Sequence, residues 1–137
     1  MSIKFPLVPV HSDIGILYKP FIPVFLKTPL GALRINFLLD SGADYSVAPR
    51  QIAESMGLDL GALPHKNVSG LEGGKVKGAL GKLSGEIAGH PFKVRCLFTD
   101  RNDVPSLLGR LDFFDRFDIC FDAKKRTVIL DPTAHEK

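Results

Sequence analysis

Phe37-Leu38-Leu39-Asp40-Ser41-Gly42-Ala43-Asp44-Tyr45-Ser46 is a segment in which an apolar run passes directly into a carboxylate, a hydroxyl and a glycine. The three apolar residues before Asp40 indicate a strand that is buried on both faces at its end. One interpretation of the polar residues is a simple turn, in which Ser41 caps and Gly42 takes a positive φ. Taken alone, the tripeptide favours that turn, so the rest of the chain must decide whether the loop has a function.

The composition is that of one ordinary globular domain. The chain has 137 residues, of which 45% are hydrophobic and 24% charged, and single cores usually take about 100–200 residues. The net charge is only +3 and the basic residues are scattered, which argues against a nucleic-acid partner. Cys96 and Cys120 are far apart, so neither a disulfide scaffold nor a zinc cluster fits, and we expect both to be small buried hydrophobes.

The termini and the apolar runs predict no membrane contact. No run approaches the roughly 18 residues of a membrane helix, and Met1–Val10 is interrupted by lysine and prolines in a way that does not fit a signal peptide. We therefore expect a cytoplasmic protein. Residues 1–18 are expected to form an N-terminal arm, residues 19–131 the domain and residues 132–137 a C-terminal tail.

Glycine and proline interrupt the chain too often for long helices, with 13 Gly and 10 Pro. Short strands with regularly spaced turns predict a mostly β fold, a small barrel or sandwich. Two segments have room for a short helix, Pro49–Met56 and Leu111–Arg116, the first with proline at its start and Gly57 at its end. The expected strands are Phe21–Lys27, Leu33–Leu39, His65–Ser69, Lys75–Leu80, Leu83–Ile87, Phe92–Phe98, Phe117–Phe121 and Thr127–Leu130.

Two further segments accompany the Asp40 loop in a particular order. The glycine-rich stretch Val68–Lys75 follows it, and then Val104–Arg110, an apolar run that closes on Leu-Gly-Arg before the second short helix. This order resembles the retropepsin-like aspartic proteases over roughly Lys19 to Leu130. The resemblance implies a closed β-barrel with a glycine-rich flap hairpin and one or two short helices.

The reaction of that family needs two catalytic carboxylates, and the sequence can be searched for loops of the Asp-Ser/Thr-Gly type that would supply them. Hydrolysis of a peptide bond by water needs a base for the water and an acid for the leaving amine, and two carboxylates that share one proton supply both. At ~4 Å and an effective dielectric near 20 their repulsion is ~4 kcal/mol, so one of them stays protonated. This chain has a single Asp-Ser/Thr-Gly, at Asp40. If the chain is an aspartic protease, as the resemblance implies, the second carboxylate must come from a second copy, in a symmetric homodimer.

The resemblance implies roles for the residues of the loop. Asp40 would be the catalytic carboxylate of each subunit, and the Ser41 hydroxyl would bond across the dimer axis to the partner's loop. Gly42 would let the loop turn and let substrate approach the backbone. Asp44 and Arg110 match a structural pair that ties the active-site loop to the helix and, through the dimer, to the other subunit.

The same resemblance implies a peptide or protein substrate bound as an extended chain, with no cofactor and no metal. Two residues depart from the retroviral pattern: Tyr45 replaces an acidic residue beside a subsite, and Glu72 stands near the flap tip where an apolar residue is usual. Leu107 and Leu108 are expected to pack beneath the loop. The expected substrate-binding residues are Ala43, Tyr45, Gly70, Leu71, Glu72 and Gly73.

Other interpretations of the sequence remain to be compared with an aspartic endopeptidase. The first is a non-proteolytic, dimeric peptide-binding module of the same fold, which would bind an extended chain as an added strand. The second is a plain barrel with a chance Asp-Ser-Gly turn. A phosphate loop is rejected, because neither Gly74-Lys75 nor Gly81-Lys82 is followed by Ser or Thr.

Overall fold

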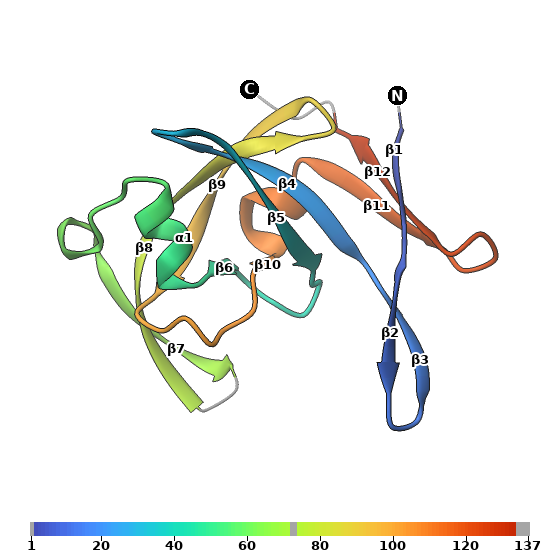
Figure 1. Ribbon diagram of the computed structural model, residues 1–137, viewed down its shortest axis with the longest axis horizontal. Coiled ribbons are helices and arrows are strands. Elements are labelled where there is room, and N and C mark those ends of the chain that lie inside the picture. The colour runs from blue at the N-terminus through green and yellow to red at the C-terminus, as the bar shows by residue number, and fades with distance from the viewer. Residues whose placement is uncertain (1, 72–73, 134–137) are drawn as a thin grey trace.

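The computed structural model of the protein (Figure 1) describes residues 2–71 and 74–133 and is mostly β, as the sequence predicts. Three short helical segments interrupt the strands: α1 (Arg50–Ser55), η1 (Leu60–Ala62) and η2 (Arg110–Phe114). The strands are β1 (Ile3–Pro6), β2 (Val8–Ser12), β3 (Gly15–Lys19), β4 (Phe21–Thr28), β5 (Gly31–Leu39), β6 (Ser46–Ala48), β7 (His65–Leu71), β8 (Gly74–Ile87), β9 (His90–Thr99), β10 (Leu107–Leu108), β11 (Phe117–Asp122) and β12 (Thr127–Pro132).

Six strands close into a barrel in the order β4-β5-β10-β6-β9-β8, with β7 attached outside β8. The closing contact is an antiparallel pairing of β4 with β8, in which Leu26 lies opposite Gly85. A Cβ atom at Gly85 would lie 2.6 Å from the carbonyl oxygen of Phe25, so only glycine permits the two backbones to come this close. Closure removes the sheet edges that would otherwise be exposed at β4 and β8.

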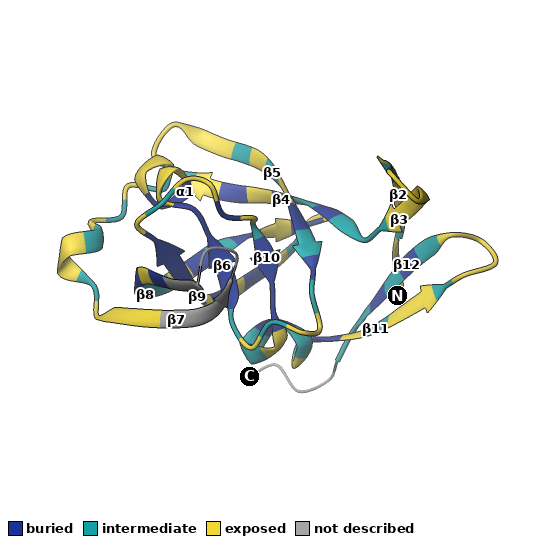
Figure 2. Ribbon diagram, turned by 90° about the horizontal axis from the view of Figure 1, so that it is seen from below, coloured by how far each residue is buried: buried dark blue, intermediate teal, exposed yellow. Residues whose placement is uncertain are grey.

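The core of the barrel consists of side chains at alternate positions along each strand, which point inward. On β4, Ile22, Val24 and Leu26 are fully buried while the alternate Phe25 is 40% exposed, the pattern of a strand with one face toward a core. Figure 2 shows the same alternation along the barrel strands. Among the predicted packing residues, Leu107 and Leu108 are both buried beneath the Asp40 loop.

The first predicted helix is confirmed. It runs from Arg50 to Ser55, with Pro49 in extended conformation at its N-cap. Gly57 ends it at φ +80°, a conformation in which a Cβ is disfavoured.

The second predicted helix is wrong in its first turn. Within η2, Leu111 has φ −64° and ψ 127°, and Asp112 has φ 67° and ψ −42°, neither of which is helical. The physical reason is tertiary, because the Asp112 carboxylate bonds to Arg95 on β9. That contact holds the backbone at residue 112 in the left-handed region, which Asp tolerates better than most residues.

Two other expectations need correction. The segments Lys75–Leu80 and Leu83–Ile87 belong to one strand, β8, because Gly81 continues the strand instead of turning it. A Cβ there would lie 3.0 Å from side-chain atoms of Leu63 and Phe98. Cys96 is buried as expected, but Cys120 is exposed on β11, where its side of the strand faces away from the core.

Most of the described residues expected to form the N-terminal arm lie in the strands β1, β2 and β3. β1 pairs with β12, which also pairs with β11, in a separate three-stranded sheet beside the barrel. β2 and β3 form a two-stranded hairpin that projects from the body, at the lower right of Figure 1. Among the described residues, no helix is long and apolar enough to cross a membrane.

Candidate active site

The Asp40 loop begins where β5 leaves the barrel. β5 pairs in parallel with β10, and Leu39 lies opposite Leu108. The backbone N–H of Asp40 continues this ladder by donating to the carbonyl oxygen of Leu108 at 3.0 Å. Leu39 and Leu108 are buried, while Asp40 is only half-buried. The barrel therefore fixes the backbone of Asp40 and leaves its carboxylate at the surface.

A tight turn then orients the Asp40 carboxylate. The N–H of Gly42 donates to Oδ1 of Asp40 at 2.9 Å, and the N–H of Ala43 donates to the Asp40 carbonyl oxygen at 3.1 Å. This is the Asx-turn that the tripeptide predicts. The expected positive φ at Gly42 is wrong, because that residue is outside the set with positive φ. Glycine serves here by leaving room, since a Cβ would lie 3.2 Å from Oδ1 of Asp40.

The far end of the loop is fixed by two residues that the sequence analysis did not identify. Ser46 is fully buried, and its Oγ accepts the N–H of Gly109 at 3.1 Å. A Cβ at Gly109 would lie 2.3 Å from the carbonyl oxygen of Tyr45 and 2.8 Å from that of Ala43. The available signals were the polar Ser46 before the apolar Val47 and the glycine directly after Leu107-Leu108.

Asp44 and Arg110 lie beside one another through their backbones. The N–H of Arg110 donates to the Ala43 carbonyl oxygen at 2.8 Å, and the N–H of Leu111 donates to that of Asp44 at 2.9 Å. Both side chains are exposed. In the described part of the chain, no ion pair joins them. Their role in stabilising a dimer stays a prediction.

The ion pair next to this segment is instead Arg95–Asp112. The guanidinium Nε and Nη2 atoms of Arg95 each donate to a carboxylate oxygen of Asp112 at 2.9 Å, and so does the backbone N–H of Arg95. Hydrogen bonding from Arg95 lowers the pKa of Asp112 to about 2. This bidentate geometry is specific to arginine. The ion pair ties η2 to β9 beside the Asp40 loop.

The expected flap is partly described. β7 and β8 pair as an antiparallel hairpin that carries Gly70 and Leu71 at the end of β7. Glu72 and Gly73 lie outside the described residues. The base of this hairpin contacts the active-site loop, because the Lys66 ammonium lies 5.4 Å from the centroid of the Tyr45 ring, a distance suited to a cation–π contact.

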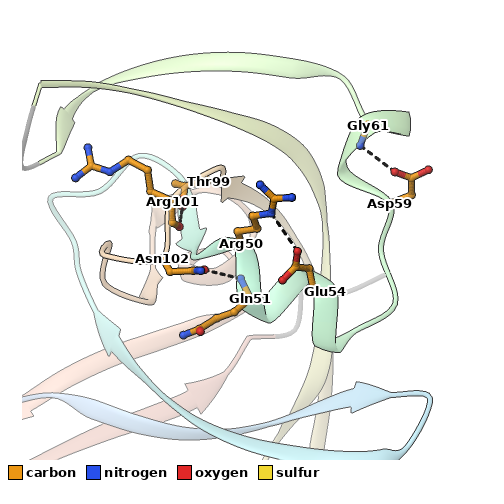
Figure 3. Close-up of polar contacts among 8 residues, drawn as sticks. All are labelled: Arg50, Gln51, Glu54, Asp59, Gly61, Thr99, Arg101 and Asn102. Carbon is orange, nitrogen blue, oxygen red and sulfur yellow. Dashed lines mark hydrogen bonds and ion pairs between the residues drawn. The ribbon is translucent and has the colours of Figure 1, made fainter.

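A pocket of about 450 Å³ lies between α1, η1 and the base of the β7–β8 hairpin, and Asp40 does not line it. Figure 3 shows how polar contacts fix its α1 side. The N–H of Gln51 donates to Oδ1 of Asn102 at 2.8 Å, and Arg50 pairs with Glu54 at 3.0 Å. This pocket is therefore separate from the Asp40 loop.

The fold and the loop define a class of protein, the retropepsin-like aspartic proteases. A crystal structure of a retropepsin-like aspartic protease from Rickettsia conorii matches with a TM-score of 0.64 and 24% identity, over 95% of this chain and 98% of that one. The EIAV protease in complex with the inhibitor HBY-793 matches with a TM-score of 0.57 and 24% identity, over 77% and 92%. At this level of identity both likenesses concern the fold.

The family itself is shown by sequence. The family model described as aspartyl protease matches residues 29–111, which include the Asp40 loop, β7, β8 and Arg110. The chain therefore belongs to the aspartyl protease family, with the retropepsin-like fold predicted from its sequence. A search of curated proteins gives no match.

Proposed function

We propose that this chain is an aspartic endopeptidase that acts as a homodimer, with one Asp40 from each subunit. One observation carries the proposal: the only Asp-Ser/Thr-Gly of the chain lies at the surface end of β5, and a backbone N–H donates to its carboxylate. A single oriented, half-buried carboxylate is half of a two-carboxylate site. A two-fold axis beside the loop would supply the other half.

The reaction follows from two such carboxylates. Repulsion between them keeps one protonated and one ionised. The ionised carboxylate accepts a proton from a water molecule, whose oxygen attacks the peptide carbonyl, while the protonated one donates its proton to the carbonyl oxygen. The resulting diol collapses as its C–N bond breaks. The carboxyl that took the proton of the water donates it to the leaving nitrogen, and the other carboxylate accepts a proton from a hydroxyl of the diol. No covalent enzyme intermediate forms, and the shared proton is restored.

The residues around Asp40 would prepare this chemistry. The exposed Ser41 hydroxyl would bond to the partner's loop, and the absence of a side chain at Gly42 would let a substrate backbone approach. The N–H of Gly42 holds the orientation of the carboxylate to which it donates. Fixing donors before the reaction avoids their reorganisation during it.

The flap hairpin would cover an extended substrate. We place Gly70, Leu71, Glu72 and Gly73 over the substrate backbone, where closure would exclude water. Ala43 and Tyr45 would line the floor, and Tyr45 contacts Lys66 at the base of the flap. Apolar residues flanking the cleaved bond are the expected substrate preference.

The test is a cleavage assay on a peptide library at several pH values, with Asp40→Asn as the control. The wild type should cleave with an acidic, bell-shaped pH profile, because the two carboxylates titrate as one coupled unit. Asp40→Asn should keep its dimer and lose cleavage. The alternative function, a peptide-binding module of the same fold, is favoured if the wild type is dimeric and binds peptides but cleaves none between pH 3 and 7.

A further inference from the structure

Basic side chains that are scattered in the sequence lie together on the outer face of the barrel. Lys82 on β8 lies opposite Arg95 on β9, and Ser84 lies opposite Lys93. Residues that pair directly in an antiparallel sheet share a face. Leu83 is fully buried and points into the core, so its two neighbours on β8 and their partners on β9 point outward.

Lys27 adds a third strand to this face. The pairing of β4 with β8 consists of two residue pairs, and Leu26 lies opposite Gly85 at its end. Because Leu26 is buried, the next residue, Lys27, points outward on the side of the sheet that carries Ser84. The fold therefore gathers cations from β4, β8 and β9.

Two adjoining hollows lie on this face, with volumes of about 640 Å³ and about 410 Å³. Both are lined by Lys27, Ser84 and Lys93. Each volume lies within the roughly 300–1,000 Å³ of ligand pockets. The polar residues discussed below, which we call the basic groove, are Lys27, Lys82, Ser84, Lys93, Arg95 and Arg116.

The basic groove is positively charged. All of its residues except Ser84 are Lys or Arg, and no acidic residue lines either hollow among the described residues. Two acidic side chains lie close to it: Asp112, which is bonded to Arg95, and Glu86, which follows Ser84 on the same face of β8. Such an excess of cations on one face attracts an anionic partner.

Two of the cations are held in place before any partner binds. Nη2 of Arg116 donates to the carbonyl oxygen of Lys93 at 3.0 Å, and the Arg95 guanidinium is fixed by both carboxylate oxygens of Asp112. Side chains that are already ordered lose less conformational entropy on binding. The basic groove is therefore better prepared for an anion than a set of free lysines.

The larger hollow also has an apolar floor. Met56, Leu58 and Leu63, from the segment that follows α1, line it beside the cations. Met56 and Leu58 are partly buried against the main core, which holds this floor in position. An apolar side chain of a partner could therefore bind next to its acidic ones.

The aromatic content of the groove favours a peptide over nucleic acid. Phe92 is the aromatic residue that lines the smaller hollow, and it is only 5% exposed. Single-stranded nucleic acid is usually bound by stacking of its bases on accessible aromatic rings. A buried ring offers no face for such stacking.

We propose that the basic groove binds an extended peptide segment in which acidic residues are followed by an apolar residue. Lys93 and Arg95 are two residues apart on one strand, which matches the spacing of alternate side chains in an extended peptide. Binding does not require Asp40. That the segment belongs to a protein substrate, outside the cleaved region, rests on the proposed function.

The groove is separate from the candidate active site. None of residues 40–46 lines either hollow. In Figure 1 the β4–β5 and β8–β9 turns lie at the top of the view, whereas the loop between β5 and β6 lies toward the bottom. A segment in the groove would therefore leave the Asp40 loop free.

Fluorescence anisotropy of the full chain carrying Asp40→Asn tests the binding, since under the proposed function this variant does not cleave the probe. The probe is a labelled peptide in which Glu-Ser-Glu-Ser precedes Leu, and the matched probe has Gln in place of Glu. The acidic probe should bind about tenfold more tightly at low salt, and added salt should reduce the difference by screening the charges. Equal binding of the two probes, or no binding of the acidic one, overturns the proposal.

Charge reversal locates the binding. Lys27→Glu with Lys93→Glu should weaken binding of the acidic probe about tenfold. The matched control, Lys124→Glu with Lys125→Glu, changes the net charge equally at the exposed turn between β11 and β12 and should leave the affinity unchanged. Circular dichroism checks that both variants fold. Equal losses in the two variants, or tighter binding of a single-stranded oligothymidine than of the acidic probe, overturn the proposal.

Cleavage by the wild type separates this proposal from the proposed function. If the acidic probe binds in the groove and no library peptide is cleaved, the groove stands and the protease proposal fails. If peptides are cleaved and the acidic probe does not bind, the protease proposal stands and the groove fails. If both hold, a cleaved peptide that carries the acidic segment on a flexible Gly/Ser linker should have a lower KM with the wild type than with Lys27→Glu/Lys93→Glu, at equal kcat. Equal KM values would overturn the assignment to a substrate.

Discussion

Gly109 lies so close to Tyr45 that a Cβ at residue 109 would be 2.3 Å from the Tyr45 carbonyl oxygen. The same glycine donates its N–H to the buried Oγ of Ser46. Both contacts are made to backbone or buried atoms that cannot move aside cheaply. The strand that carries Leu107 and Leu108 is therefore pressed against the end of the active-site loop.

Gly109→Ala is expected to destabilise the fold by at least about 3 kcal/mol, because the added methyl meets rigid backbone. Urea unfolding measures the loss. Gly61→Ala is the matched control, since a Cβ there would lie 3.4 Å from Oδ1 of Asp59, which is an ordinary contact. Similar urea midpoints of unfolding for the two variants would contradict this expectation, because they would show that the backbone around Tyr45 shifts to accommodate the added methyl group.

Asp112→Asn should remove a pH-dependent part of the stability. The pKa of Asp112 falls from 3.8 to about 2 in the folded chain because of hydrogen bonds from Arg95. The contribution is therefore complete above about pH 3.8 and lost as the pH falls through 2. We expect about 1–2 kcal/mol, allowing for the solvent that screens the half-exposed guanidinium.

Unfolding at pH 5 and at pH 2 checks this expectation. Asparagine tolerates the positive φ of residue 112, so Asp112→Asn changes the charge without straining the backbone. The variant should be less stable than the wild type at pH 5, and the difference should shrink at pH 2. A difference that does not change with pH would contradict the assignment.

Arg110→Ala is expected to weaken the dimer and the activity together. Its guanidinium is exposed in the single chain and forms no ion pair among the described residues, so a partner in the dimer is where it would contribute. The protein concentration that gives half-maximal specific activity should rise about tenfold, or 1.4 kcal/mol. Arg34→Ala is the control, because Arg34 is also exposed but lies on β5. This variant should change neither the dimerisation nor the specific activity. Unchanged sedimentation and turnover of Arg110→Ala would remove this role.

The local parts of the fold were predictable because local chemistry determines them. Pro49 and Gly57 mark the ends of α1, and the spacing of apolar residues gives β4 and β5. The loop at Asp40 was predictable from an apolar run that meets an aspartate and a glycine. Within that loop, Gly42 is needed because a Cβ would crowd the Asp40 carboxylate, and not because its φ is positive. The sequence alone cannot distinguish these two reasons for a glycine.

The rest depends on contacts between distant segments. Pairing of β1 with β12 joins Ile3 to Leu130, and nothing near either strand specifies the partner. The irregular start of η2 depends on Arg95, which lies 17 residues from Asp112. The buried role of Ser46 likewise appears only when Gly109 arrives beside it. Such features require the assembled barrel.

The two cysteines, Cys96 in the core and Cys120 on the outside of β11, give the protein a practical asymmetry. Burial raises the pKa of the Cys96 thiol, which keeps that sulfur protonated and out of reach of reagents. A maleimide dye should consequently attach to the folded chain at one position, without mutagenesis. Mixing donor- and acceptor-labelled batches would then report subunit exchange in the proposed dimer by energy transfer, in the native sequence and in real time.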